Sequence, residues 1–303
     1  MKRIFSIIIP TYNLENCIVE CLQSIEAQTI SREKFELIVV DDCSSDNTCK
    51  NIYEFLKNST LKSQFRRNSK NRGPGIPRNT GIDLARGDFL LFVDGDDFLA
   101  SNCLEELERV VSEATHDIDA VAYNWDYLET NSLCDDSPSE MGLVVQRRDK
   151  PSVGQRRDLD LALLPQIERV KQFLGMGMDG SVIYTAIKRS VFKENNIHFY
   201  PGFHEDIDVI YKVYWNCRVI KGIQSPLYYK RDREGSIVRT ISKAHIDGYY
   251  RSWNEVGKFT KQRVPQDQWG TYLSYFASGI TGAVAIKTLK ILNSFPEDKG
   301  ARA

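Results

Sequence analysis

A chain of 303 residues, 42% of them hydrophobic, is long enough to bury a large core, which excludes a disordered protein and leaves room for one large domain with a smaller appendage. Its 40 basic and 41 acidic residues leave a formal charge of -1, so no overall attraction to nucleic acid is expected and any anion site must be local. Seven cysteines without a C-x-x-C pair argue against a disulfide framework and for a reducing, cytoplasmic compartment, and the apolar run before Pro10 is too short for an export signal.

Apolar residues in the first hundred positions alternate between strand-like runs and helix-like spacing. Phe5–Ile9 and Phe35–Val40 are continuous apolar runs, typical of strands buried on both faces. Between them, Ile18, Leu22 and Ile25 follow a helical period. We expect strands at 5–9, 35–40, 62–67 and 89–93 and helices at 14–29, 45–57 and 77–85. This alternation predicts an α/β domain with a mostly parallel sheet flanked by helices.

The second half of the chain is expected to continue with mixed elements and to end in helices. The patterns predict helices at 102–114 and 159–173, strands at 118–125 and 182–188, and a helix opened by His204-Glu205-Asp206. A polar surface excursion is expected at 129–157, and helical spacing with aromatic anchors follows from residue 244. The amphipathic run 280–292 is too short to cross a bilayer, and either packing or contact with a membrane surface is left open.

Three polar clusters follow predicted strands directly. They are Pro10-Thr11-Tyr12, Asp41-Asp42 and Asp94-Gly95-Asp96. Because ligands gather at the carboxyl ends of strands in open α/β sheets, we expect all three clusters to face one edge of the sheet. That edge is the predicted site.

The acidic turn Asp94-Gly95-Asp96 has the chemistry of a metal site. Two carboxylates one residue apart can hold a hard divalent cation such as Mg²⁺ or Mn²⁺, which in turn holds a diphosphate. The alternative is an acidic turn that caps the next helix, and its position after a buried strand favours the metal. An EF-hand is excluded because Leu99 stands where that loop requires Gly.

Charged residues near the same edge predict contacts with a nucleotide. Asp41 and Asp42 could accept hydrogen bonds from a base or ribose, or could instead form a local turn. Asn71 and Arg78 lie beside a Gly-rich turn and could approach phosphates, and for Arg72 in that turn a solvated surface charge is the alternative. The turn lacks the third Gly of a dinucleotide-binding fingerprint, so a dehydrogenase is not expected.

A later pair of carboxylates could act in catalysis. Glu205 and Asp206 open a predicted helix, where acidic residues are favoured by the helix dipole alone. Transfer of a group to a hydroxyl, however, needs a base that takes the hydroxyl proton, and a carboxylate at this position could serve. The cationic segment 228–236, including Arg233, could fold over a diphosphate or form an amphipathic strand.

With these residues in view, the chain resembles family 2 glycosyltransferases with the GT-A fold, of the type that builds bacterial capsule, lipopolysaccharide or exopolysaccharide. The resemblance covers roughly residues 4–236, with its motifs in the expected order. The matching stretches are Ser6–Asn13, Leu22–Ile25 with Gln28–Thr29, Val39–Asp46, Asn71–Gly73, Arg78–Gly81, Gly87–Phe89, Asp94–Asp97 and His204–Asp206.

The resemblance implies a division of the chain and of its residues. Residues 1–240 would form the GT-A catalytic domain, with 1–100 binding the nucleotide and 101–240 facing the acceptor, and 241–303 would form a small C-terminal helical region. Nucleotide-sugar contacts would come from one set of residues: Pro10, Tyr12, Asp41, Asp42, Asn71, Arg78, Asp94 and Arg233. Asp96, with Asp94, would bind Mn²⁺ or Mg²⁺, and Asp206 would be the base, supported by Glu205. Some members have a metal-ligating His where this chain has Arg233, so Arg233 would instead touch the diphosphate.

The implied activity is an inverting transfer from a nucleotide diphosphate, UDP-hexose or UDP-N-acetylhexosamine, to a hydroxyl of a glycan or lipid-linked glycan. Such an enzyme would act in the cytoplasm, with peripheral contact at the inner face of the membrane left open. Two alternatives remain. One is a non-catalytic nucleotide-sugar-binding subunit of a glycan assembly complex. The other is a sugar-nucleotide pyrophosphorylase, which is disfavoured because Pro10–Asn13 contains no Gly.

Overall fold

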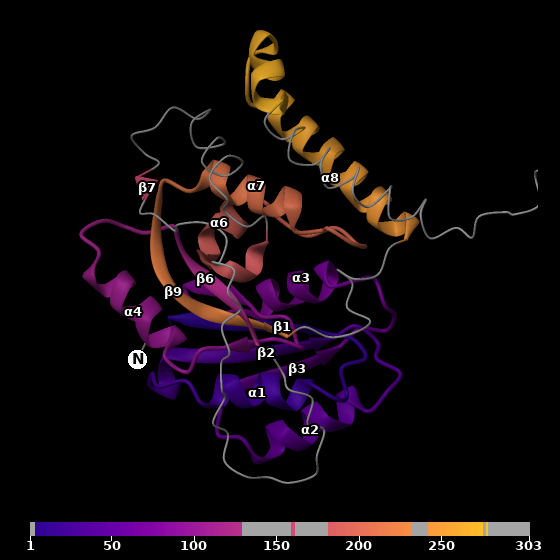
Figure 1. Ribbon diagram of the computed structural model, residues 1–303, viewed down its shortest axis with the longest axis vertical. Coiled ribbons are helices and arrows are strands. Elements are labelled where there is room, and N and C mark those ends of the chain that lie inside the picture. The colour runs from indigo at the N-terminus through magenta and orange to yellow at the C-terminus, as the bar shows by residue number, and fades with distance from the viewer. Residues whose placement is uncertain (1–3, 129–158, 161–180, 232–241, 275–276, 278–303) are drawn as a thin grey trace, which may run out of the picture.

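The computed structural model describes residues 4–128, 159–160, 181–231, 242–274 and 277 (Figure 1). These residues form one nine-stranded sheet flanked by helices, which confirms the predicted α/β class. The strands are β1 (Phe5–Thr11), β2 (Phe35–Asp41), β3 (Ser63–Arg67), β4 (Phe89–Phe92), β5 (Phe98–Leu99), β6 (Ala120–Leu128), β7 (Leu159–Asp160), β8 (Thr185–Lys188) and β9 (Val219–Arg231). The α-helices are α1 (Ile18–Glu26), α2 (Thr48–Asn58), α3 (Gly75–Leu84), α4 (Cys103–Glu113), α6 (Arg189–Glu194), α7 (Ile207–Asn216) and α8 (Lys243–Lys261).

The amino-terminal half of the sheet is parallel. Strands β3, β2, β1 and β4 lie side by side, and Phe5 of β1 pairs with Phe35 on one side and Phe89 on the other. Every residue of β1, β2 and β4 is buried because helices cover both faces, with α1 and α2 on one side and α3 on the other (Figure 1). The carboxyl ends of these strands therefore meet at one edge, as predicted.

The remaining strands extend the sheet with mixed directions. Beyond β4 the order is β8, β6, β9 and β5, with β7 also paired to β9. Strand β8 is antiparallel to both neighbours, whereas β6 and β9 are parallel to each other with an irregular register near Asn124. The antiparallel pairing of β5 with β9 places Phe98 opposite Tyr229, so the residues after the acidic turn lie against the end of β9.

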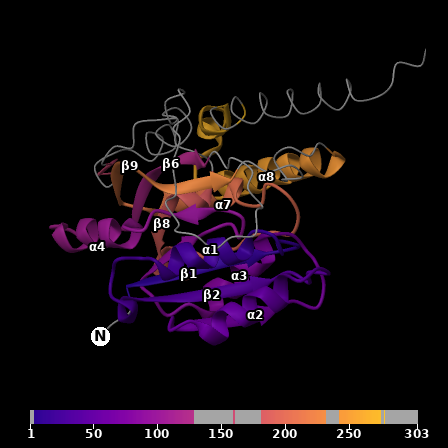
Figure 2. The ribbon, with the colours of Figure 1, turned by 60° about the horizontal axis from the view of Figure 1, so that its bottom comes forward.

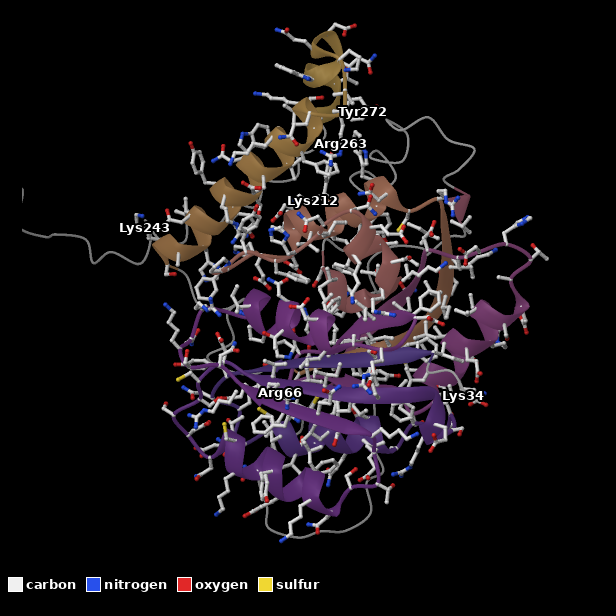
Figure 3. The ribbon with its side chains drawn as sticks, turned by 180° about the vertical axis from the view of Figure 1, so that it is seen from behind. Lys34, Arg66, Lys212, Lys243, Arg263 and Tyr272 are labelled. Atoms are coloured by element: carbon white, nitrogen blue, oxygen red, sulfur yellow. The ribbon has the colours of Figure 1, made fainter. Side chains whose placement is uncertain are left out.

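Helix α8 crosses the molecule above α7 (Figures 1 and 2). The two helices share a buried contact, in which the Tyr211 hydroxyl lies 3.1 Å from the Thr260 hydroxyl. Viewed from behind, Lys243 marks the start of α8, Arg263 lies beyond its other end, and Lys212 of α7 lies beneath it (Figure 3). Within the described ranges, no helix has the length and apolar character needed to cross a membrane.

Two sequence predictions are wrong at their starting residues. The helix predicted at 159–173 begins instead as strand β7, because Leu159 and Asp160 pair with Ile220 and Val219 of β9. The strand predicted at 182–188 begins only at Thr185, since residues 182–184 form one 3₁₀ turn. Residues 161–173, the polar stretch 129–157 and the run 280–292 lie outside the described residues.

The helix predicted from residue 45 begins at Thr48. The residues before it are used by a neighbouring loop: the Asp46 carboxylate accepts the Glu15 amide at 3.1 Å and the Thr48 amide at 3.0 Å. The backbone amide of Leu14 in turn donates to the Thr48 hydroxyl at 2.6 Å. The loops that follow β1 and β2 are therefore hydrogen-bonded to each other before either helix begins. Helix α1, predicted from residue 14, accordingly begins at Ile18.

Candidate active site

The loop after β2 is shaped by Asp41. Its carboxylate is fully buried and accepts the Ser44 amide at 2.9 Å together with the Ser44 hydroxyl. Arg67 Nε lies 3.4 Å away, at the end of the neighbouring strand β3. These contacts bend the chain through Cys43, whose φ is +69°. In this structure Asp41 holds the loop, and its predicted contact with a nucleotide stays a prediction.

Asp42 fastens the 68–73 segment to the end of β2. One carboxylate oxygen accepts the amides of Arg72 and Gly73 at 2.7 and 2.8 Å, and the other accepts the Asn68 side chain at 2.8 Å. Asn71 is exposed on this segment, and its side chain accepts the Gly73 amide at 2.9 Å.

The end of β1 supplies the neighbouring residues of the same edge. Pro10 is buried, whereas the Tyr12 side chain beyond it is 44% exposed. The Asn13 amide donates to the Ser44 hydroxyl at 2.9 Å, which joins the ends of β1 and β2. An exposed aromatic ring beside two ordered loops is suited to stacking on a base.

The acidic turn after β4 presents two of its three carboxylates. Asp94 and Asp96 are partly exposed, whereas Asp97 is buried and points inward. The Tyr228 hydroxyl and the Arg231 amide donate to Asp97 at 2.7 and 2.9 Å. Burial, together with the charges of Asp96 and Asp94, raises the pKa of Asp97 to about 8.

The partly exposed carboxylates of Asp94 and Asp96 fit a hard divalent cation by their oxygen chemistry. Over the described ranges, no group of three or more His, Cys, Asp or Glu side chains could enclose a metal. A cation at this turn would therefore take ligands from Asp96 and Asp94 and complete its shell with diphosphate oxygens and water, which suits Mg²⁺ and Mn²⁺.

Arg78 of α3 links the acidic turn to the second carboxylate pair. Its side chain is only 4% exposed, and its guanidinium donates to Asp94 Oδ1 at 2.7 Å and to Glu205 Oε1. Although burial alone would lower the pKa of this guanidinium, Glu205 and Asp94 raise it above its ordinary value. The Phe199 ring lies 5.6 Å from the same group. A permanently charged side chain therefore stands between the two carboxylate clusters.

Glu205 and Asp206 lie at the start of α7 in different environments. Glu205 is buried, and burial raises its pKa to about 7 against the opposing effect of Arg78. Asp206 is partly exposed, and burial raises its pKa while Arg78 and the Ser181 hydroxyl lower it. Asp206 occupies the N-cap position, yet its side chain makes no capping hydrogen bond. Its carboxylate is thus free of the helix-capping role that the sequence left open, and a raised pKa makes it a stronger proton acceptor.

The segment that leads into α7 packs directly on the segment between β3 and α3. The Gly202 amide donates to the Arg72 carbonyl at 3.1 Å, and a Cβ on Gly75 would come within 2.5 Å of the Tyr200 carbonyl. The Asn79 side chain also bonds the backbone of Phe199 in both directions, each at 2.8 Å. The predicted convergence of these segments on one edge is therefore present.

Sequence reasoning missed part of this edge. Arg233 lies outside the described residues, but Arg231 contacts the acidic turn: its Nε donates to the Asp96 carbonyl at 3.2 Å, and its guanidinium lies 4.7 Å from the Phe98 ring. Tyr228 donates to Asp97 from the same strand. The segment 228–236 was expected either to fold over a diphosphate or to form an amphipathic strand, and the acidic turn could not be named from the sequence as the partner of Tyr228 and Arg231.

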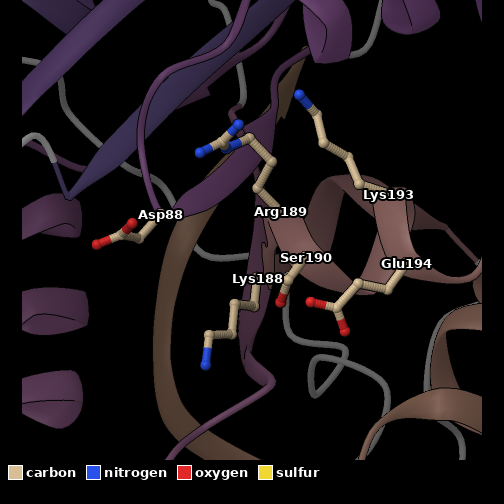
Figure 4. Close-up of a pocket in the computed structure, with 6 residues that line it drawn as sticks. All are labelled: Asp88, Lys188, Arg189, Ser190, Lys193 and Glu194. Atoms are coloured by element: carbon tan, nitrogen blue, oxygen red, sulfur yellow. The ribbon is translucent and has the colours of Figure 1, made fainter.

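A hollow of about 220 Å³ elsewhere in the molecule does not belong to this site. It is lined by Asp88, Lys188, Arg189, Ser190, Lys193 and Glu194 (Figure 4). Lys188 pairs with Phe89, the first residue of β4, so the hollow lies at the opposite end of that strand from the acidic turn. It is shallow and carries mixed charge, and nothing in the site described above reaches it.

Comparisons with known proteins identify the family of this chain. The model of Glycosyl transferase family 2 matches residues 6–193. The chain is 28% identical over 249 residues to poly(ribitol-phosphate) beta-N-acetylglucosaminyltransferase TarS of Staphylococcus aureus, covering 81% of this chain but only 38% of TarS.

Solved structures share the fold. The structure of S. aureus TarS residues 1–349 in complex with UDP-GlcNAc is similar with a TM-score of 0.62 at 24% identity, over 94% of this chain and 82% of that one. Mannosyltransferase PcManGT of Pyrobaculum calidifontis in complex with GDP-Man and Mn²⁺ is similar with a TM-score of 0.58 at 14% identity, over 98% of this chain and 77% of that one.

Proposed function

The chain belongs to glycosyl transferase family 2, and from that premise we propose that it transfers a sugar from a nucleotide diphosphate to an acceptor hydroxyl with inversion at the anomeric carbon. The observation that carries the proposal is the position of Arg78, which bonds Asp94 of the donor-side turn and Glu205 beside Asp206. Donor binding and proton transfer require two such clusters within reach of one sugar.

Each residue has a place in the proposed reaction. Tyr12 and the loops held by Asp41 and Asp42 would receive the base and ribose, with Pro10 behind them and Asn71 beside them. Asp206 takes the proton of the acceptor hydroxyl while the acceptor oxygen bonds to the anomeric carbon. The bond from that carbon to the diphosphate breaks on the opposite face. The ion pair of Arg78 with Glu205 keeps Glu205 and Asp206 in place. Arg233 is a proposed contact to the diphosphate.

A divalent cation, Mn²⁺ or Mg²⁺, is proposed at Asp96 with Asp94. When bound it would neutralise charge on the leaving diphosphate. The support is the pair of partly exposed carboxylates on the turn and the Mn²⁺ complex of the similar mannosyltransferase.

The donor class is proposed from the relatives. TarS is named a beta-N-acetylglucosaminyltransferase and has a structure with UDP-GlcNAc, so a UDP-sugar, UDP-N-acetylhexosamine or UDP-hexose, is the donor we propose. A hydroxyl of a bacterial surface glycan or of its lipid-linked precursor is the proposed acceptor, and the cytoplasm, including the inner face of its membrane, is the proposed place of action. This chain spans 38% of TarS, and the acceptor class is proposed from the name of that relative.

The first experiment is a panel of UDP-, GDP- and dTDP-sugars with Mn²⁺, scored for slow donor hydrolysis and for binding by calorimetry. Binding and hydrolysis of one UDP-sugar would support the proposed pocket and identify the donor. Binding of none would contradict the proposed roles of Asp42 and Asp96.

The second experiment tests the base. Asp206→Asn should lower kcat by roughly 10²–10⁴-fold, since the amide cannot take a proton, while UDP-sugar binding stays unchanged. Asp247→Asn is the matched control, because Asp247 lies exposed on α8 and pairs only with Lys243 among the ion pairs described for it. Donor binding without turnover in the wild type would favour the alternative, a non-catalytic nucleotide-sugar-binding subunit.

A further inference from the structure

Helix α8 holds the loop that carries Glu205 and Asp206. Arg251 of α8 donates from Nη1 to the Pro201 carbonyl at 2.8 Å and from Nη2 to the His204 carbonyl at 2.9 Å. The Ser252 hydroxyl donates to the same His204 carbonyl, also at 2.9 Å. Two adjacent residues of α8 thus fix the backbone of the residue two positions before Asp206.

His204 is held in a backbone conformation that it would not adopt freely. Its φ is +54°, in the left-handed region, which costs a non-Gly residue free energy unless its surroundings maintain it. The Tyr249 ring stacks on the His204 ring at 3.9 Å between centroids, and His204 Nε2 lies 3.0 Å from Nδ1 of the buried His245. Helix α8 therefore supplies contacts to both the side chain and the carbonyl of this strained residue.

The contact also requires close approach of the two backbones. A Cβ on Gly248 would lie 2.3 Å from the Phe203 carbonyl oxygen, so no larger residue fits there without a shift. Phe203 in turn stacks on His245 with ring centroids 4.8 Å apart. These contacts therefore run along α8 from His245 to Ser252, about two helical turns.

A buried charged group also lies where α7 meets α8. Asp208, in the first turn of α7, is fully buried, pairs with Lys212 at 2.7 Å and lies 3.9 Å from Arg251. Removing one partner from a buried set of this kind leaves an uncompensated charge, so its members keep one arrangement. Arg251 thus lies beside a buried carboxylate of α7 while its guanidinium bonds the carbonyls of the loop.

We propose that α8 is a positioning element for the catalytic base, with Arg251 as its central residue, and that it sets the direction in which Asp206 faces the acidic turn. Arg251 touches neither of the predicted reacting groups, and it acts through the carbonyls of Pro201 and His204. The inference rests on the proposed function, since it assigns the base to Asp206. Residues 243–261 lie outside the part of the chain matched by the family model, which ends at residue 193.

The test compares Arg251→Ala with Arg263→Ala. Arg263 lies just beyond the far end of α8, where it contacts Phe259 and Gln262 and no part of the 201–206 loop among the bonds described for it (Figure 3). For full-length variants, kcat, donor KM, UDP affinity by calorimetry and amide hydrogen exchange of residues 201–206 would be measured.

Arg251→Ala should lower kcat at least about 10-fold, leave donor KM and UDP affinity within about 2-fold, and speed exchange in the 201–206 segment, because misplacement of a base affects the transition state and not donor binding. Arg251→Lys should recover part of kcat, since an ammonium can still donate to one carbonyl. Should Arg251→Ala fail to fold, Ser252→Ala, which removes one of the two donors to His204, should show the same pattern at smaller size.

Two results would overturn the inference: unchanged kcat in a folded Arg251→Ala protein, or a loss confined to KM. Failure of the proposed function has a different signature, because the wild type itself would then transfer no sugar from any donor. In that event hydrogen exchange alone decides whether α8 fixes the loop, and equal exchange in wild type and Arg251→Ala would count against it.

Discussion

The buried carboxyl group of Glu205 makes the stability of the fold depend on pH. Burial raises its pKa from an ordinary value of 4.5 to about 7, even with Arg78 beside it. Between these pH values the folded protein keeps a proton that the unfolded chain releases, so the group makes the free energy of unfolding fall as pH rises. This loss is complete above pH of about 7.

Glu205→Gln should remove that pH dependence. We expect the free energy of unfolding of the variant relative to wild type to rise between pH 5 and pH 7.5, by an amount on the order of 1–3 kcal/mol. Urea unfolding of both proteins at the two pH values measures it. An unchanged difference between the two proteins would mean that Glu205 titrates near its ordinary value and that Arg78 dominates its environment.

Individual side chains show where sequence reasoning ends. The sequence placed Asp94, Arg78 and Glu205 near one sheet edge, because strand ends and helix starts can be located from periodicity. It could not pair Arg78 with Glu205, since 127 positions separate them and only the packed fold brings them together. No separate role was predicted for Asp97, because its neighbours Asp94 and Asp96 carry the same carboxylate chemistry. Only the pairing of β5 with β9 turns Asp97 inward.

At the scale of elements, the contact between α3 and β1 depends on one glycine. A Cβ at Gly81 would lie 2.3 Å from the side chain of Ile8, which is fully buried in β1. Gly81→Ala should therefore destabilise the protein by about 1–3 kcal/mol through overpacking. The displaced helix also carries Arg78, so donor hydrolysis should fall with it.

Gly257→Ala is the matched control, because a Cβ there meets nothing within 4 Å and the site lies within α8. Removing backbone freedom from the unfolded chain should stabilise that variant by about 0.4–1 kcal/mol. Unfolding midpoints of the two variants should move in opposite directions, and equal shifts would contradict the close packing of α3 on β1.

Elements buried on both faces were predictable, and elements set by distant partners were not. Strands β1, β2 and β4 were predicted because each is a continuous apolar run. Strand β7 was mistaken for the start of a helix since its two residues carry no period of their own and are extended only by pairing with β9. The same holds for β5, whose two residues were assigned to no element.

At the scale of the whole molecule, donor binding should stabilise every element that meets the site. The loops after β1, β2 and β4 come from one parallel half of the sheet. Arg78 bonds the turn after β4 to Glu205, and Gly202 is bonded to Arg72, whose amide donates to Asp42 at the end of β2. A ligand that binds only the folded state stabilises it by an amount fixed by its concentration relative to Kd, about 2.7 kcal/mol at 100 times Kd. Because those loops are joined, the gain should appear as a single shift of one cooperative transition.

The shift in unfolding temperature should depend on the divalent cation. UDP with Mn²⁺ should raise the unfolding temperature by several degrees, and UDP with a chelator should raise it far less, since the diphosphate then lies beside Asp94 and Asp96 without a neutralising charge. Asp96→Asn should lose most of the Mn²⁺-dependent part of the shift while keeping the part that survives chelation, which comes from the base and ribose contacts. Equal shifts with and without Mn²⁺ in the wild type would move the diphosphate contact away from the acidic turn and onto cationic side chains alone.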